Sequence, residues 1–214
     1  EGRCSACGLW NTVGEFKLPQ NRSATTARTW TNFSKPDVLE LSTVSTKDRE
    51  RAHVLSQEVN RVFGGGIVPG SITLIVGDPG IGKSTLLLQI AADVAKTGHE
   101  TMYVSGEESP AQIKMRADRM AISGRKLFLM TSTSVSEILS RLDNHPPALA
   151  VIDSIQMIHD DSVSSEAGSV VQVKECTRKL MEWAKATEIP VLISGHVTKG
   201  GDISGPRILE HMVD

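Results

Sequence analysis

Long apolar segments, numerous cysteines and an excess of charge of one sign are all missing from this sequence. No stretch approaches the roughly 20 apolar residues that a membrane-spanning helix needs, so we expect no contact with a membrane. The net charge of −2 gives no overall basic character, and any contact with nucleic acid must come from a local patch. The three cysteines are too few for a disulfide framework, which favours a reducing compartment such as the cytoplasm. The chain opens without a signal-peptide pattern.

The composition is that of an ordinary globular protein, with 39% hydrophobic and 22% charged residues. A length of 214 residues allows one substantial domain with a small appendage. The appendage is predicted at residues 1–15, where Cys4 and Cys7 have the spacing of one arm of a zinc site. A closed structural zinc site needs four ligands, and no second pair of this kind follows. These residues therefore form either half of a zinc site or a terminal turn with two free thiols.

Residues 16–50 are rich in serine and threonine and lack sustained periodicity, which predicts a linker. Beyond them, short apolar runs predict five buried strands, at 72–76, 101–104, 127–130, 149–152 and 191–194. Helical patterns lie between these runs, the first at 85–96 and the last at 169–186. Apolar strands that alternate with helices predict an α/β fold, with a mostly parallel sheet flanked by helices on both faces.

Two further helices are expected to begin at capping boxes, in which an N-cap serine and the residue three positions later bind each other's backbone. The two sequences are Ser109-Pro110-Ala111-Gln112 and Ser134-Val135-Ser136-Glu137. We therefore expect helices that start at residues 110 and 135.

The nine residues GDPGIGKST lie directly after the first expected strand and before an expected helix. Their glycines, lysine and serine match the Walker A pattern in the structural context that the pattern requires. Glycines let backbone N–H groups approach phosphate oxygens, the lysine reaches the β- and γ-phosphates, and the serine hydroxyl binds Mg²⁺. The sequence therefore predicts a nucleotide site formed by Gly77, Asp78, Pro79, Gly80, Ile81, Gly82, Lys83, Ser84 and Thr85.

Acidic residues follow two of the expected strands. Asp153 ends an apolar strand in the Walker B manner and would hold Mg²⁺, or else it caps the next turn. Glu107 and Glu108 follow another strand, where a carboxylate could activate the water that attacks the γ-phosphate. Spacing alone leaves the choice between these two glutamates open, and an ordinary charged strand end is the alternative.

Two other classes of P-loop protein lack support in the sequence. The Asn-Lys-x-Asp motif with which GTPases read guanine is absent, because the stretch at 198–202 lacks the asparagine and is one residue too long. The arginine-rich lid of many small-molecule kinases is also absent, since the residues after Asp153 are rich in serine and glycine.

A series of motifs resembles the RadA (Sms) DNA-repair proteins, which are RecA-superfamily ATPases of bacteria and some plant organelles. The motifs are NRVFGGGIVPGS from Asn60, the GDPGIGKSTLLLQIA stretch, YVSGEES from Tyr103, VIDSIQ from Val151, and GHVTK through GPRILEHMVD from Gly195. The resemblance runs from about residue 51 to the end. In addition, Cys4 and Cys7 resemble the second arm of the family's four-cysteine zinc finger. The chain stops before the Lys-Asn-Arg-Phe-Gly motif and the Lon-like domain that follow in the family.

The resemblance implies a RecA-like core over residues 51–214 that hydrolyses ATP with Mg²⁺, and Zn²⁺ in the full-length protein. It assigns Lys83 and Ser84 to the phosphates and Mg²⁺, and Asp153 to Mg²⁺ through water. It also favours Glu107 over Glu108 as the catalytic base. The resemblance also places His196 and Lys199 at the position of a γ-phosphate sensor, whereas the residues alone would make His196 an ordinary strand-end histidine.

The resemblance further implies an action on DNA, with two DNA-binding loops at 157–171 and 197–206. Lys199 and Arg207 would contact DNA phosphates, although each could instead be an ordinary surface cation. The implied partners are single-stranded and branched DNA, a RecA-type recombinase and other copies of the chain in a hexamer. The implied activity is branch migration in homologous recombination, in the cytoplasm near the nucleoid or in a plant organelle. The alternative class is a nucleotide-switched assembly module without motor activity.

Overall fold

The computed structural model of the protein describes residues 38, 40–44, 50–196 and 209–214, which belong to the unit formed by residues 37–214. The expected zinc-finger stub at 1–15, with Cys4 and Cys7, lies outside the described residues. So do most of the expected linker at 16–50 and the expected DNA contacts Lys199 and Arg207. Within the described part of the linker, Leu41–Thr43 form a short 3₁₀ turn, η1.

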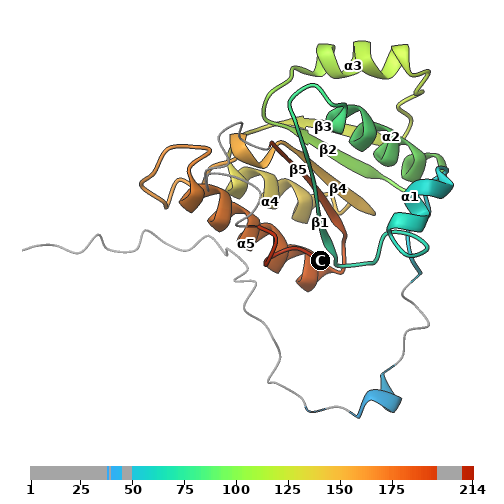
Figure 1. Ribbon diagram of the computed structural model, residues 1–214, viewed down its shortest axis with the longest axis horizontal. Helices are drawn as coiled ribbons and strands as arrows, with labels where there is room; N and C mark the ends of the chain where they lie inside the picture. Colours follow the sequence, from blue (N-terminus) through green and yellow to red (C-terminus); the bar gives the residue numbers. More distant parts are fainter. Residues whose placement is uncertain (1–37, 39, 45–49, 197–208) are drawn as a thin grey trace, which may run out of the picture. The chain divides into compact units, whose positions relative to one another are not determined.

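A parallel sheet of five strands lies at the centre of the described part of the chain (Figure 1). The strands lie side by side in the order β1-β5-β4-β2-β3. Each predicted strand is confirmed and extends one or two residues further at its carboxyl end. Their bounds are β1 Ile72–Gly77, β2 Thr101–Ser105, β3 Leu127–Thr131, β4 Leu149–Asp153 and β5 Val191–His196.

Helices cover both faces of the sheet, as the alternating pattern predicts. In Figure 1, α2 and α3 lie on one side of the sheet, and α4 and α5 lie on the other. The bounds of the helices in the described residues are α1 Gln57–Val62, α2 Lys83–Lys96, α3 Pro110–Arg119, α4 Val135–Asn144 and α5 Val170–Thr187, with the 3₁₀ turn η2 at Ile155–Met157. The observed architecture is the predicted α/β fold of a P-loop NTPase-like core.

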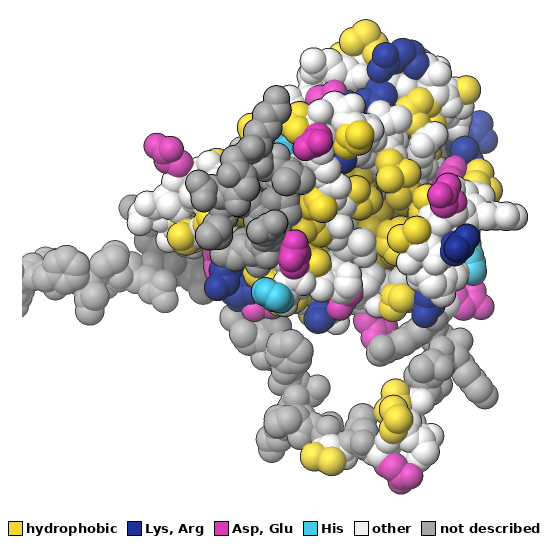
Figure 2. All heavy atoms as spheres, viewed as in Figure 1, with side chains coloured by type: hydrophobic (Ala, Val, Ile, Leu, Met, Phe, Trp, Pro, Cys, Tyr) yellow, Lys and Arg dark blue, Asp and Glu magenta, His cyan; other side chains and the backbone are white. Residues whose placement is uncertain are grey.

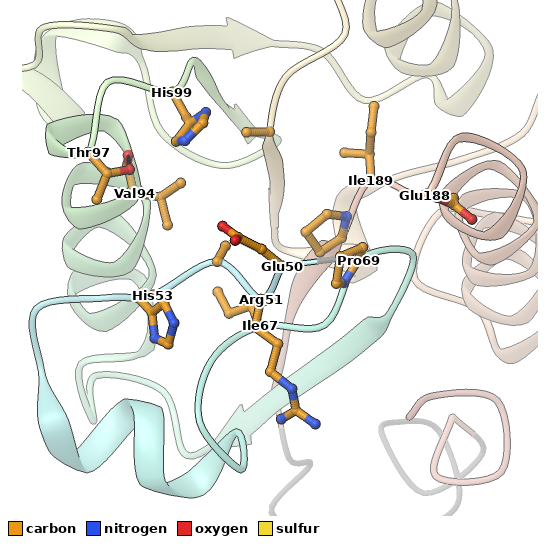
Figure 3. Close-up of a pocket in the computed structure, with 13 residues that line it drawn as sticks. Glu50, Arg51, His53, Ile67, Pro69, Val94, Thr97, His99, Glu188 and Ile189 are labelled. Atoms are coloured by element: carbon orange, nitrogen blue, oxygen red, sulfur yellow. Dashed lines mark hydrogen bonds between the residues drawn. The ribbon is translucent and has the colours of Figure 1, made fainter. Parts of the chain in front are cut away.

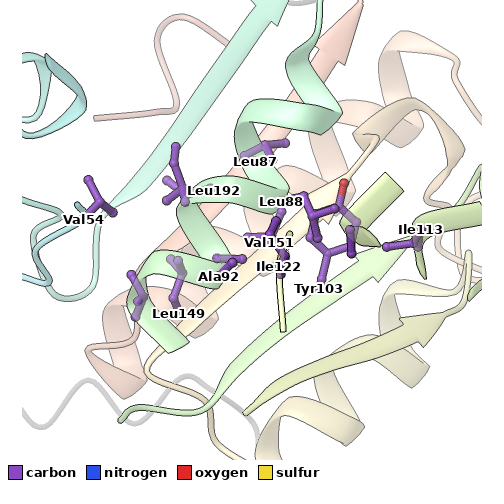
Figure 4. Close-up of a cluster of buried hydrophobic side chains, with 14 of the residues drawn as sticks. Val54, Leu87, Leu88, Ala92, Tyr103, Ile113, Ile122, Leu149, Val151 and Leu192 are labelled. Carbon is purple, nitrogen blue, oxygen red and sulfur yellow. The ribbon is translucent and has the colours of Figure 1, made fainter. Parts of the chain in front are cut away.

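The hydrophobic core lies between α2 and the sheet (Figure 4). Leu87, Leu88 and Ala92 of α2 pack against the apolar side chains of β2, β4 and β5, among them Val151 and Leu192. All residues of β2 and β4 are buried, which explains why these strands read as continuous apolar runs rather than as alternating ones. Burial of this surface stabilises the sheet and fixes α2 on it.

One of the two predicted capping boxes is confirmed and the other is wrong. The Ser109 hydroxyl accepts from the Gln112 N–H at 3.4 Å, and the Ser109 N–H donates to Gln112 Oε1 at 2.9 Å. At α4, by contrast, the Ser134 side chain makes no capping bond in the described structure. Glu137 accepts instead from the Ser132 hydroxyl at 2.8 Å. A β-bridge between Ser134 and His159 sets the entry to this helix, a long-range contact that local spacing does not reveal.

The strand β1 forms one edge of the described sheet, and an apolar groove of about 880 Å³ runs beside it. Figure 2 shows hydrophobic side chains gathered between β1, α1 and α2 in this region. At the start of the strand, the Asp214 N–H donates to the Ile72 carbonyl, and the Ile72 N–H donates to Asp214 Oδ2, each at 2.9 Å. The last described residues therefore bind the sheet edge beside this groove.

Candidate nucleotide-binding and catalytic site

The Walker A residues form a tight loop between β1 and α2, which we call the P-loop (residues 77–85). Gly80 and Gly82 have φ values of +81° and +108°, in a region that L side chains rarely adopt. Gly82 is also the N-cap of the 14-residue helix α2, so the first N–H groups of this helix face the loop without a side-chain cap. Free N–H groups at the positive end of a helix form an anion site, which fits the phosphates of a nucleotide.

The Lys83 ammonium group lies inside the P-loop. The residue is 7% exposed, and its Nζ donates to the carbonyls of Gly77 at 2.8 Å and Asp78 at 3.0 Å. Ser84 follows directly in the first turn of α2. The structure therefore brings the predicted lysine, serine and backbone N–H groups together at one end of the sheet.

Two hydroxyl groups hold the Asp153 carboxylate, which lies at the end of β4 and is 7% exposed. Tyr103 donates to Oδ2 and Ser194 donates to Oδ1, each at 2.5 Å. Burial raises the pKa of Tyr103, and the neighbouring Asp153 carboxylate raises it further, so this phenol stays a donor. The Tyr103 hydroxyl also lies 3.4 Å from the Ser84 carbonyl, and it thereby links the carboxylate to the P-loop.

Neither Tyr103 nor Ser194 is among the residues predicted for the site. Both carry a hydroxyl group within a buried strand, and a buried hydroxyl that needs a partner is the signal that could have identified them. A buried hydroxyl needs a partner, and here both partners are oxygens of the same carboxylate.

Glu107 and His196 lie close together although Glu107 follows β2 and His196 is the last residue of β5. His196 Nε2 is 3.3 Å from Glu107 Oε1, and the Ser154 hydroxyl donates to the same oxygen at 2.5 Å. The Glu107 side chain is 41% exposed, so one side of its carboxylate remains open to solvent. Ser154 follows β4, and β4 lies between β2 and β5 in the sheet, which explains why it reaches Glu107.

Glu108 points to a different partner. Its carboxylate forms an ion pair with Arg116 of α3, whose side chain is 11% exposed, and its N–H donates to the Ser105 hydroxyl at 2.9 Å. The two adjacent glutamates therefore differ in their surroundings. Glu107 faces His196 and Ser154, whereas Glu108 ties the end of β2 to α3.

The residues present fit a nucleotide with Mg²⁺. Ser84 and Asp153 are the oxygen ligands that the site offers, and Mg²⁺ commonly takes its remaining ligands from water and substrate phosphates. Within the ranges that the structure describes, no group of three or more His, Cys, Asp or Glu could hold a metal ion without such help.

The first expected DNA-binding loop, 157–171, is acidic. It contains Asp160, Asp161 and Glu166, and no lysine or arginine. Asp160 is buried and pairs with Lys179 of α5. The loop therefore offers no lysine or arginine for a contact with DNA phosphates.

A separate cavity of about 370 Å³ lies at the opposite end of the sheet. Figure 3 shows Glu50, His53 and His99 around it, and it is lined also by residues that precede β1, β2, β4 and β5. None of the predicted site residues lines this cavity, so it is distinct from the P-loop.

Comparisons with known proteins agree with the P-loop geometry. The profile of a family described as "AAA domain" matches residues 35–202, which include Lys83, Glu107, Asp153 and His196. Proteins named "DNA repair protein RadA" match the whole chain. Identity is 45% for the one from Bacillus subtilis, 47% for that from Chlamydia trachomatis and 41% for that from Haemophilus influenzae. The matches cover 47%, 46% and 47% of those proteins, so the chain spans about half the length of the curated relatives it matches.

Among the described helices, none is long and apolar enough to cross a membrane.

Proposed function

Because the chain belongs to the AAA domain family and is a RadA-type ATPase, we propose that it hydrolyses Mg-ATP to act on DNA during repair. One observation supports this most directly. Four side chains come together at the carboxyl ends of the strands, namely those of Lys83, Glu107, Asp153 and His196. Strand pairing sets Gly77 opposite His196 and Ser105 opposite Asp153. As a result, the ends of four parallel strands surround the P-loop with the groups that hydrolysis needs.

In the proposed reaction, water attacks the γ-phosphorus and ADP leaves. Lys83 and the N–H groups of α2 bind the β- and γ-phosphates, and Ser84 and Asp153 would hold Mg²⁺. When bound, Mg²⁺ would neutralise negative charge on the phosphates. Glu107 accepts the proton of the attacking water, and His196 responds to the presence of the γ-phosphate.

The proposed substrate is single-stranded DNA and its branched recombination intermediates, since the relatives are named DNA repair proteins. Lys199 and Arg207 are the proposed phosphate contacts, because the loop 157–171 carries no lysine or arginine. The same proposal includes a hexameric assembly and a RecA-type recombinase as partner. It also includes zinc binding through Cys4 and Cys7 and a place near the nucleoid.

The test is the rate of ATP hydrolysis by the chain with and without single-stranded DNA. A DNA motor requires that DNA change the rate, and a Lys199→Ala variant should reduce the dependence of DNA affinity on salt by about 0.7 in logarithmic slope. If DNA leaves the rate unchanged while ATP alters the oligomeric state, the chain acts instead as a nucleotide-switched assembly module.

A further inference from the structure

The short turn η2 contacts three parts of the candidate site at once. It begins directly after Ser154, whose side chain is fully buried and whose hydroxyl donates to Glu107 Oε1 at 2.5 Å. Gln156 Nε2 lies 3.5 Å from the His196 carbonyl. Met157 packs on Gly106, the residue before Glu107. Glu107, the proposed base, and His196, the proposed γ-phosphate sensor, are therefore each in contact with this turn or with the serine that precedes it.

The contact between Gly106 and Met157 leaves no free space. A Cβ atom on Gly106 would lie 2.6 Å from the Met157 Cβ, a separation that real Cβ atoms essentially never show. The end of β2 and η2 therefore touch almost backbone to backbone. Because no gap separates Gly106 from the Met157 Cβ, a displacement of the strand end that carries Glu107 toward η2 displaces η2 as well.

The turn leads straight into the loop 158–169, and that loop is firmly built. His159 pairs with the chain before α4, donating its N–H to the Thr133 carbonyl at 2.8 Å and accepting from the Val135 N–H at 2.9 Å. The buried side chain of Gln172 donates to carbonyls of the loop and accepts from the Asp160 N–H at 2.8 Å. These bonds join the loop to the chain before α4 and to α5, so a shift of η2 strains or displaces contacts that span residues 158–169.

We propose that Ser154 is a positioning residue that couples the Glu107 carboxylate to the loop 158–169 through η2. The inference rests on the proposed ATP hydrolysis at this site. While Glu107 accepts from Ser154, η2 and the loop stay in the arrangement described above. When Glu107 turns toward the attacking water, the buried Ser154 hydroxyl loses its partner. A buried donor without an acceptor is unfavourable, so η2 shifts and carries the loop with it.

The experiment measures amide hydrogen exchange over residues 158–169, with ADP and with a non-hydrolysable ATP analogue, in the wild-type chain and in Ser154→Ala. In the wild type, the exchange rates in the two nucleotide states should differ by about 5-fold or more. In Ser154→Ala, nucleotide affinity should stay within about 2-fold of wild type, because this side chain is not a phosphate ligand. The difference in exchange should disappear, and turnover should fall by about 10- to 100-fold as Glu107 loses its orientation.

Two further variants test whether the effect is specific to the Ser154 hydroxyl and its contact with Glu107. Ser164→Ala removes an exposed hydroxyl of the same loop and should behave as wild type in every measurement. In a Glu107→Ala background, Ser154→Ala should add no further effect on exchange, because the proposed coupling passes through the carboxylate.

The outcomes distinguish the coupling from the proposed reaction. A wild-type chain that neither binds nor hydrolyses ATP overturns the proposed function. A chain that hydrolyses ATP, but whose exchange over 158–169 is the same in both nucleotide states, overturns the coupling alone. So does a Ser154→Ala variant that keeps the wild-type difference.

Discussion

The Tyr103 hydroxyl donates a hydrogen bond of 2.5 Å to the Asp153 carboxylate, from the strand next to the one that carries the aspartate. Ser194, on the strand at the other side of β4, donates to the second oxygen. A carboxylate held from both sides would lose little further freedom on binding Mg²⁺. The orientation of Asp153 is thus set by residues that the Walker B pattern does not include.

Tyr103→Phe should weaken the response to Mg²⁺ while it preserves the fold, because it removes one oxygen and little packing. A hydrogen bond to a charged group contributes about 1.5–3 kcal/mol, which corresponds to an increase of about 10- to 100-fold in the Mg²⁺ concentration needed for half-maximal hydrolysis. Ser194→Ala, which frees the other oxygen, provides the comparison. An unchanged Mg²⁺ midpoint in both variants would show that neither hydroxyl orients the carboxylate.

Lys83→Ala should lower ATP hydrolysis by about 100-fold or more, since it removes the cation that compensates charge on the β- and γ-phosphates. The matched control is Lys96→Ala at the other end of the same helix, where the lysine is exposed and pairs with Asp93. Steady-state turnover of both variants is the measurement. Near-normal turnover in Lys83→Ala would contradict the assignment of the site.

Glu107→Gln and Glu108→Gln should differ sharply. The first substitution removes the proposed base but keeps the shape of the side chain, so ATP should bind while turnover falls by about 10²- to 10⁴-fold. The second weakens the ion pair with Arg116 and should act mainly on stability. Nucleotide affinity, turnover and thermal unfolding are measured for both proteins. If Glu108→Gln is the inactive variant, the roles of the two residues are reversed.

His196→Ala should uncouple ATP binding from DNA binding. In the wild type, ATP and single-stranded DNA should each strengthen binding of the other by the same factor, in the range of about 5- to 150-fold, because linkage is reciprocal. The measurement is DNA affinity with and without a non-hydrolysable ATP analogue. If the ATP analogue changes DNA affinity equally in the variant and the wild type, His196 is a strand-end histidine without a sensor role.

Lys179→Met should destabilise the fold, because it leaves the buried Asp160 carboxylate without its counter-ion. Breaking a buried pair from one side costs about 3–5 kcal/mol, which urea unfolding followed by circular dichroism would detect. Asp160→Asn, which removes the charge itself, should cost less. An equal or smaller loss in Lys179→Met would contradict a stabilising role for this pair.

The same ion pair predicts a dependence of stability on pH. Burial alone would raise the pKa of Asp160, but the Lys179 ammonium and the Ser162 hydrogen bonds outweigh burial and hold the pKa below its usual value. A carboxyl group whose pKa is lowered by folding contributes stability above its unfolded pKa of about 3.9, and loses it as the pH falls through the folded pKa. Asp160→Asn should therefore unfold with a weaker dependence on pH below about 4.

Sequence patterns predicted the parts of the molecule that depend on local order. The five strands, the P-loop and the Ser109 capping box follow from short-range spacing, and the structure confirms them. The Ser134 capping box is wrong because pairing with His159 decides the entry to α4. The helix α1 was not predicted, since it has only six residues, too few for a sustained apolar period, and none of them is buried.

The candidate site was predictable to a lesser extent. The Asp153 environment depends on Tyr103 and Ser194, which are 50 and 41 residues away in sequence and meet the carboxylate only across the sheet. The different surroundings of Glu107 and Glu108 depend on Arg116 and Ser154, and no spacing rule connects these residues. Motifs identify which residues can take part in the chemistry, whereas cross-strand partners determine how each is oriented.

The close contact of Gly106 with Met157 has a consequence for natural variation among related chains. Any side chain at position 106 collides with the Cβ of residue 157, so a lineage can acquire one only if residue 157 becomes glycine or η2 is displaced. The two positions should therefore change together in evolution. Covariation between the two positions in an alignment of many relatives would show that this contact has constrained both of them.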